Sequence, residues 1–181
     1  MLEFKDSDGF VKSGQILSAY VPYFRFGGMS LSRGDHENMN DGNPLTEITE
    51  EQRAYAASAL NSLPFAKLIG MELVDIRPDE AVIKIEMRDD LRQPGGILHG
   101  GVTATLIDTA MAFAVRTRLP IDEATATIDL TVHYLRPHIS GTFICTAKVV
   151  RAGKRIFTVS ADVVGAEGKL IATAISTYTR V

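Results

Sequence analysis

The chain has 181 residues, of which 45% are hydrophobic and 23% charged, a composition typical of globular proteins large enough to bury one well-filled core. A formal net charge of -3 supplies no positive field for nucleic acid or an anionic membrane surface, so we expect small molecules and copies of the chain itself as partners. The single cysteine, Cys145, excludes an intramolecular disulfide and a cysteine-rich metal site, and it favours a cytoplasmic location.

Residues 1–46 differ in composition from the rest and are predicted to be an N-terminal extension and linker, followed by one domain over residues 47–181. Glycine, asparagine, aspartate and proline dominate residues 33–44, which is typical of turns. Residues 35–43 lack the ligand spacing of a calcium loop, so no metal site is expected there. No apolar run approaches the roughly 18 residues that span a bilayer, and we expect neither a membrane span nor a signal peptide.

The domain is predicted to open with a helix and a hairpin. In residues 46–63, Thr49 and Gln52 have the three-residue spacing of a capping box, and Pro64 disfavours helical geometry in the residue before it. Apolar and polar residues then alternate in two segments, as they do in strands. These segments are 71–77 and 80–88, joined by a turn at Pro78-Asp79.

A long central helix is predicted over residues 102–118, and it carries a single carboxylate, Asp108. This side chain lies on the seam between an apolar face and a face with Thr105, Thr109 and Arg116. Aspartate is a poor helix former, and no cation lies one helical turn away, so helix stability does not explain it. A half-exposed aspartate without a function is the alternative. The apolar face comprises Val102, Leu106, Ile107, Ala110, Met111, Phe113 and Ala114.

The start of this helix is rich in glycine, with Gly95-Gly96 and Gly100-Gly101 on either side of a segment that ends at His99. Free backbone N–H groups and the positive end of the helix dipole favour negative charge at such a place. The arrangement indicates an oxyanion hole, with tight packing as the alternative.

Four further strands are predicted after the helix, and turn residues separate them, which favours antiparallel pairing. One helix among about six strands is most economically packed as an α+β layer, with the helix against a curved antiparallel sheet. The four segments are 125–136, 141–151, 155–164 and 169–180.

The order of these motifs resembles a known family. His99-Gly100-Gly101, then Leu106-x-Asp108-x-Ala110, then the strand ATIDLTVHYLRP are similar to the hotdog-fold acyl-CoA thioesterases, especially their phenylacetate-degradation (PaaI-type) branch. The resemblance extends from about Leu60 to Val181. It implies a hotdog fold, homodimers with active sites between subunits, pairing of dimers into tetramers, and hydrolysis of an aryl or medium-chain acyl-CoA. Coenzyme A is then part of the substrate, and no metal or redox cofactor is needed.

The resemblance also implies a role for each matching residue. The Gly101 N–H polarises the thioester carbonyl, and Asp108 acts on water as general base or as nucleophile. His99 lies beside the carbonyl, and Thr127 supplies a hydroxyl that orients the water. Gln93 stands where many members have asparagine, so its amide is carried on an arm one methylene longer.

Spacing on the helix predicts a shared site. Gly101 and Asp108 are seven residues apart, about 10 Å of axial rise, whereas both groups must come within about 3 Å of the reacting atoms. We therefore expect the Gly101 amide from one subunit and Asp108 from the other.

Basic side chains near strand ends, in Arg136-Pro137-His138 and in the turn at residues 151–155, are candidates for holding the phosphates of coenzyme A. A solvated hairpin without a binding role is the alternative. With Gly100, the predicted substrate-binding residues are Arg136, Arg151, Lys154 and Arg155. Two other functions stay open at this point. One is a non-catalytic acyl-CoA sensor on the same fold, and the other is a hydratase or dehydratase, which would need an acid/base pair against C2 and C3 of the acyl chain.

Overall fold

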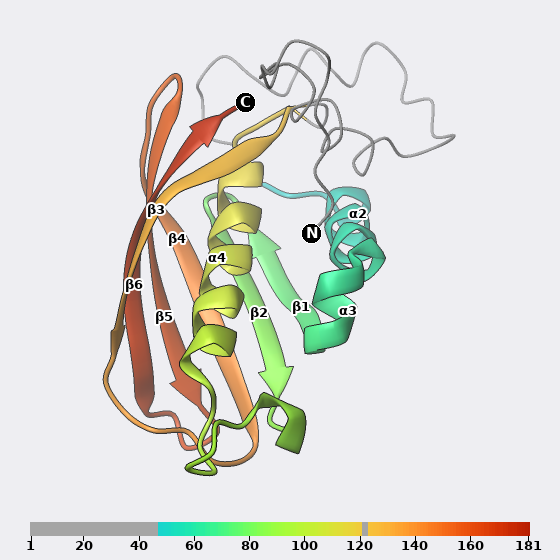
Figure 1. Ribbon diagram of the computed structural model, residues 1–181. Helices are drawn as coiled ribbons and strands as arrows, with labels where there is room; N and C mark the ends of the chain where they lie inside the picture. The colour runs from blue at the N-terminus through green and yellow to red at the C-terminus, as the bar shows by residue number, and fades with distance from the viewer. Residues whose placement is uncertain (1–46, 121–122) are drawn as a thin grey trace, which may run out of the picture. The chain divides into compact units, whose positions relative to one another are not determined.

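The computed structural model describes residues 47–120 and 123–181, in which six antiparallel strands form one sheet with a long helix across one face (Figure 1). The strand order is β1-β2-β4-β5-β6-β3. The predicted α+β class, with its central helix and antiparallel sheet, is confirmed. The predicted extension at residues 1–46 lies outside the described residues.

Every predicted strand is present, each within two residues of its expected bounds. The strands are β1 Met71–Arg77, β2 Glu80–Glu86, β3 Thr125–Tyr134, β4 Thr142–Ala152, β5 Ile156–Gly165 and β6 Leu170–Arg180. The helices are α2 Glu50–Ser62, α3 Pro64–Ile69 and α4 Gly100–Arg116, with a short 3-10 turn, η2, at Asp89–Leu91. The central helix therefore begins two residues earlier than predicted.

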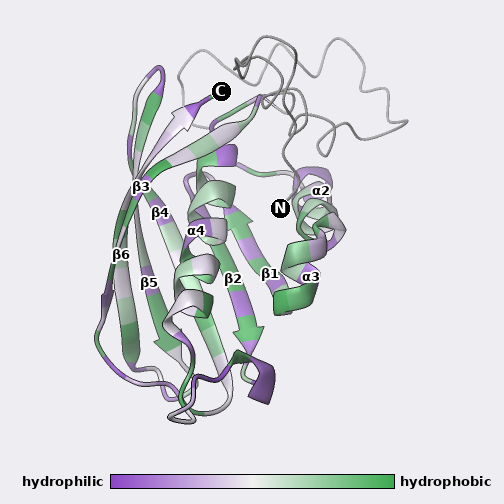
Figure 2. Ribbon diagram, viewed as in Figure 1, coloured by the Kyte–Doolittle hydropathy of each residue, from purple (hydrophilic) through white to green (hydrophobic). Residues whose placement is uncertain are grey.

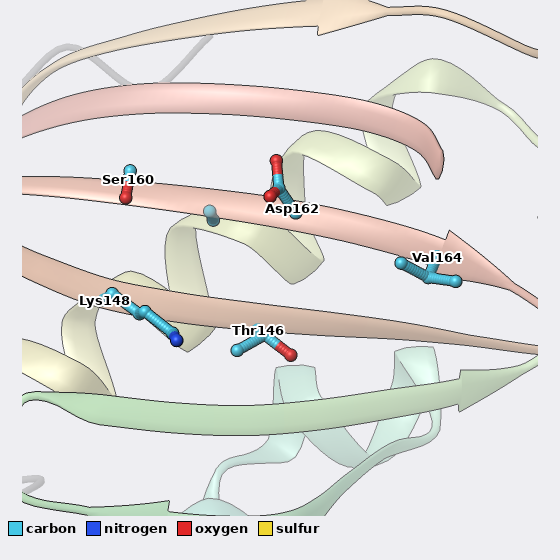
Figure 3. A pocket seen from close by; sticks show the side chains of 6 residues that line it. Thr146, Lys148, Ser160, Asp162 and Val164 are labelled. Atoms are coloured by element: carbon cyan, nitrogen blue, oxygen red, sulfur yellow. The ribbon is translucent and has the colours of Figure 1, made fainter. Parts of the chain in front are cut away.

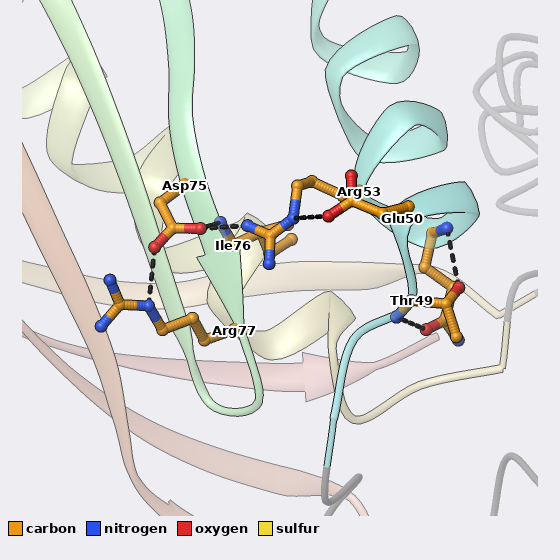
Figure 4. A network of polar contacts seen from close by, with 7 residues as sticks. Thr49, Glu50, Arg53, Asp75, Ile76 and Arg77 are labelled. Carbon is orange, nitrogen blue, oxygen red and sulfur yellow. Dashed lines mark hydrogen bonds and ion pairs between the residues drawn. The ribbon is translucent and has the colours of Figure 1, made fainter.

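Helix α2 begins with the predicted capping box. The Gln52 N–H donates to Thr49 Oγ1 at 3.2 Å, and the Thr49 N–H donates to Gln52 Oε1 at 2.9 Å (Figure 4). The helix ends before Pro64, which then occupies the first position of α3, where a missing N–H costs nothing. Helix α3 was not predicted, because six residues are too few to display a helical period.

Polar contacts attach α2 to strand β1 along one edge of the sheet (Figure 4). Arg53 contacts the Asp75 carboxylate, Arg77 Nε donates to Asp75 Oδ2 at 2.6 Å, and the Ile76 N–H donates to Asp75 Oδ1 at 2.9 Å. Partial burial opposes ionisation, but these donors outweigh it and hold the pKa of Asp75 below its ordinary value. The ionised Asp75 therefore favours the docked position of α2.

The core lies between α4 and the sheet. The predicted apolar face of α4 is buried at Leu106, Ile107, Ala110, Met111 and Ala114 and half-buried at Val102 and Phe113. Strands contribute their alternate residues, and Figure 2 shows the resulting alternation of hydrophobic and hydrophilic bands along β1 and β2. Cys145 belongs to this core, as expected of a structural thiol, and burial raises its pKa.

The opposite face of the sheet carries polar side chains. Figure 3 looks onto this face of β4 and β5, where a hollow of about 280 Å³ is lined by Thr146, Lys148, Ser160 and Asp162. Lys148 Nζ lies 3.0 Å from Glu80 Oε2. None of the predicted site residues lines this hollow.

Candidate active site

Asp108 is half-buried on α4 and lies against two hydroxyl groups from the sheet. Thr127 Oγ1 donates to Asp108 Oδ1 at 2.8 Å. The Tyr178 hydroxyl lies 2.8 Å from the same Oδ1 and 2.8 Å from the main-chain oxygen of Asp108. Thr127, for which the sequence predicted a role in orienting the water, therefore contacts the carboxylate directly, and Tyr178 is a third member that the sequence did not reveal.

Strand pairing explains why both hydroxyls reach Asp108. Strands β3 and β6 are antiparallel neighbours, and Thr127 and Tyr178 are direct cross-strand partners. Side chains of such a pair project from the same face of a sheet. Because α4 crosses that face, Asp108 meets both of them.

Tyr178 is almost completely buried, with 1% of its surface exposed. Burial, together with the negative charge of Asp108, raises the pKa of its phenol far above the ordinary value. The hydroxyl therefore remains protonated and available as a hydrogen-bond donor at every working pH.

At the start of α4, His99 is the N-cap residue, and its Nδ1 accepts a hydrogen bond from the Gly101 N–H at 2.9 Å. A neutral imidazole that accepts at Nδ1 carries its proton on Nε2. The Gly101 N–H, which the sequence predicted to polarise a carbonyl, is thus already hydrogen-bonded to the side chain of His99. The Gly100 N–H, one residue earlier, has no acceptor within residues 47–120 and 123–181.

A cavity of about 460 Å³ opens beside this helix start. Its walls include Gln93, Gly100, Tyr134 and Arg136, so three predicted site residues share one space. The Tyr134 hydroxyl donates to the Gly100 carbonyl oxygen at 3.0 Å, and one Arg136 nitrogen donates to the Leu170 carbonyl oxygen at 2.7 Å. These two hydrogen bonds hold the side chains at the cavity entrance in place at the end of strand β3.

Asp108 and Thr127 do not line this cavity. Gly100 and Asp108 are eight residues apart on one helix, about 12 Å of axial rise. The described chain therefore carries two separate half-sites, one with the carboxylate and one with the free amide.

The three predicted basic residues of the β4–β5 turn neither line the cavity beside Gly100 nor form a described hydrogen bond or ion pair with Asp108. Arg151, Lys154 and Arg155 are exposed, and the turn is closed by a hydrogen bond from the Gly153 N–H to the Ile156 carbonyl oxygen at 2.9 Å. Their predicted contact with substrate phosphate stays a prediction.

Residues 95–172 match the model of the Thioesterase superfamily. The Escherichia coli medium/long-chain acyl-CoA thioesterase YigI is 30% identical over 133 residues, which cover 64% of this chain and 84% of that protein. Human acyl-coenzyme A thioesterase 13 is 29% identical over 134 residues, covering 71% of this chain and 93% of its own length.

Solved structures agree with this match. A variant of the phenylacetic acid degradation protein PaaI from Thermus thermophilus is 32% identical, with a TM-score of 0.61, over 66% of this chain and 100% of the other. The chain belongs to the thioesterase superfamily and has its hotdog fold. None of the helices in the described ranges is long and apolar enough to cross a membrane.

Proposed function

We propose that the protein is an acyl-CoA thioesterase, which converts an acyl-CoA and water into a carboxylic acid and free coenzyme A. The observation that carries the proposal is Asp108, a carboxylate held on a half-buried helix by two hydroxyl donors on one oxygen. The names of the human and Escherichia coli relatives support an acyl-CoA substrate.

In the proposed reaction, the Asp108 carboxylate takes a proton from water as the water oxygen attacks the thioester carbonyl carbon. The carbonyl oxygen becomes negatively charged and is stabilised by a backbone N–H at the positive end of α4. Collapse of this intermediate breaks the carbon–sulfur bond, and the proton passes to the departing thiolate. Attack by the carboxylate itself, followed by hydrolysis of the anhydride, gives the same products.

We assign the polarising amide to Gly100, in place of Gly101. The Gly101 N–H is already bonded to His99 Nδ1, whereas the Gly100 N–H has no acceptor in the described chain. Gly100 also lines the cavity that contains Gln93. His99 then acts by capping the helix and holding the Gly101 N–H away from the substrate. Gln93 lines the same cavity, and we expect its amide to orient the thioester.

A homodimer would unite the two half-sites. Helix α2 packs against β1 at one edge of the sheet, but no described element pairs with β3 at the other edge. Ile128 and Tyr134 on β3 are 54% and 56% exposed. A long edge strand with exposed apolar side chains is a template for pairing with another chain.

The direction of β3 supports this pairing. One end of the strand holds Thr127 against Asp108, and the other end holds Tyr134 against Gly100. Antiparallel pairing of β3 with its copy about a twofold axis brings opposite ends of the strand together. Asp108 of one subunit then approaches Gly100 of the other, twice per dimer.

We expect an aryl or medium-chain acyl group, no metal or redox cofactor, and binding of the coenzyme A phosphates by Arg136 and by the turn that carries Arg151, Lys154 and Arg155. A non-catalytic sensor would bind acyl-CoA without turnover. A hydratase would need a second acid or base near the acyl chain, whereas Asp108 is surrounded by hydroxyls that stay protonated.

Release of free thiol from a panel of acyl-CoA esters tests the proposal, with Asp108→Asn measured beside the unaltered protein. We expect turnover to fall by roughly 10²- to 10⁴-fold in the variant, while acyl-CoA binding survives. Binding without thiol release by the unaltered protein would indicate a sensor. Unchanged turnover in Asp108→Asn would remove the carboxylate from the mechanism.

A further inference from the structure

The buried Tyr178 phenol has a geometry that simple core packing does not require. Its ring belongs to the core, yet its hydroxyl lies 2.8 Å from Asp108 Oδ1 and 2.8 Å from the Asp108 main-chain oxygen. The same atom thus contacts both the helix backbone and the carboxylate that the backbone carries. Removal of this hydroxyl would therefore affect both the Asp108 carboxylate and the helix backbone that carries it.

The two oxygens of Asp108 have different surroundings. Oδ1 accepts from Thr127 and Tyr178, whereas Oδ2 has no hydrogen-bond partner among the side chains and backbone of the described residues. Two donors on one oxygen oppose rotation of the carboxylate and occupy the lone pairs of that oxygen. Oδ2 is therefore the oxygen left to interact with water.

We propose that Tyr178 is a positioning residue for the hydrolysis, whose hydroxyl holds Asp108 Oδ1 so that Oδ2 takes the proton from the attacking water. The inference rests on the proposed function, because it assigns a part in that reaction. It extends the site to strand β6, which carries none of the residues that the family resemblance identifies.

Two observations separate positioning from direct catalysis. Tyr178 is buried, so its hydroxyl does not reach a substrate that enters from the dimer interface. Burial and the nearby carboxylate raise the pKa of its phenol, so it donates a hydrogen bond without exchanging its proton. Its influence must pass through Asp108.

Tyr178→Phe removes the hydroxyl and keeps the ring in the core. We expect kcat to fall roughly tenfold to hundredfold, as for the loss of one hydrogen bond to a charged group, with little change in KM. Because the donor stabilises the ionised carboxylate, its removal makes Asp108 easier to protonate. The acidic limb of the kcat profile should move to higher pH, by about one unit for a tenfold change in that equilibrium.

Thr117→Val is the matched control, since Thr117 is also a buried hydroxyl that bonds to α4, through Ala114 O at 2.7 Å. We expect this variant to lower the melting temperature without moving the pH limb. If Tyr178→Phe likewise lowers only the melting temperature and keeps both kcat and the pH limb, the positioning role is wrong.

Two further measurements complete the test. Replacement of Tyr178 by 3-fluorotyrosine gives a more acidic phenol of similar size, so the acidic limb of the kcat profile should move to lower pH. An unmoved limb would contradict the inference even if Tyr178→Phe does not fold.

In an Asp108→Asn background, Tyr178→Phe should cause no further loss of turnover, and an additive loss would place Tyr178 in another step. Full activity in Asp108→Asn alone would instead refute the proposed base, a result distinct from the failure of Tyr178.

Discussion

Mixing two inactive variants tests whether the amide and the carboxylate come from different subunits. Gly100→Pro removes the amide proton and should preserve the helix start, because Gly100 is the first helical residue, where proline is tolerated. His99, with φ -67 and ψ 128, already has the extended backbone that a following proline requires. Loss of an oxyanion donor costs about 10²- to 10³-fold in kcat. Asp108→Asn inactivates the other half-site.

Gly100→Ala is the matched control for the proline variant. It introduces a Cβ that would lie 3.3 Å from the Tyr134 ring, and it keeps the N–H. A side chain at this position therefore requires a shift of a few tenths of an ångström by Tyr134 in both variants, whereas only proline removes the donor. Equal activity in Gly100→Pro and Gly100→Ala would contradict the assignment of this amide.

The expected recovery follows from dimer statistics. When the two variants are unfolded together in equal amounts and refolded, about half of the dimers contain one copy of each, and one of their two sites has both intact groups. About one quarter of the unaltered activity should return, measured as thiol release per subunit. A mixture of Asp108→Asn with Asp108→Ala should recover nothing. If the first mixture stays as inactive as its components, the two groups act within one chain and the shared site is wrong.

Two further predictions concern assembly and stability. Ile128→Lys places a charge on the exposed edge strand β3, so light scattering should show monomers and most turnover should be lost. The control Val74→Lys, at a site 51% exposed on β1, should keep the dimer. An Ile128→Lys variant that is dimeric and active would show that the interface lies elsewhere. Asp75→Asn should lower the melting temperature near pH 7. The pKa of Asp75 is depressed in the folded protein, so the difference in melting temperature from the unaltered protein should be complete well above 3.8, the ordinary pKa of aspartate. It should disappear as pH falls through the lower pKa of the folded protein, and a difference that persists unchanged at pH 2 would contradict the prediction.

Local sequence carries most of the fold. The alternation of β2 and the apolar stripe of α4 each report the face that is buried, and the capping box at Thr49 marks a helix start within a few residues of chain. These patterns depend only on residues that are close together in the sequence. Helix α3 was missed for the same reason, because its start at Pro64 interrupts the pattern and its six residues are too few to establish another.

The site was predicted less completely, because its contacts join distant parts of the chain. Tyr178 occupies an inward position in the alternation of β6, which by itself predicts only a core aromatic residue. Its partner Asp108 is 70 residues away, and their meeting depends on the register that sets Thr127 opposite Tyr178. No local pattern contains that register.

The choice between two neighbouring amides shows the same limit at a smaller scale. Gly100 and Gly101 are equivalent in sequence, and both are able to present an N–H at the start of α4. The direction of the His99 ring distinguishes them, since its Nδ1 occupies the Gly101 amide.

In the proposed site, one helix carries the polarising amide at its first residue and the carboxylate two turns later, a separation that an α-helix cannot shorten. A mechanism that needs both groups at one carbon therefore requires either a second copy of the helix or a different partner for one group. The edge of β3, with which no strand of the described chain pairs on its outer side, permits the first solution, because the strand that borders Asp108 at one end also borders Gly100 at the other. Dimerisation and catalysis would then depend on the same strand, and substitutions that separate the subunits should abolish turnover even where every catalytic side chain is retained.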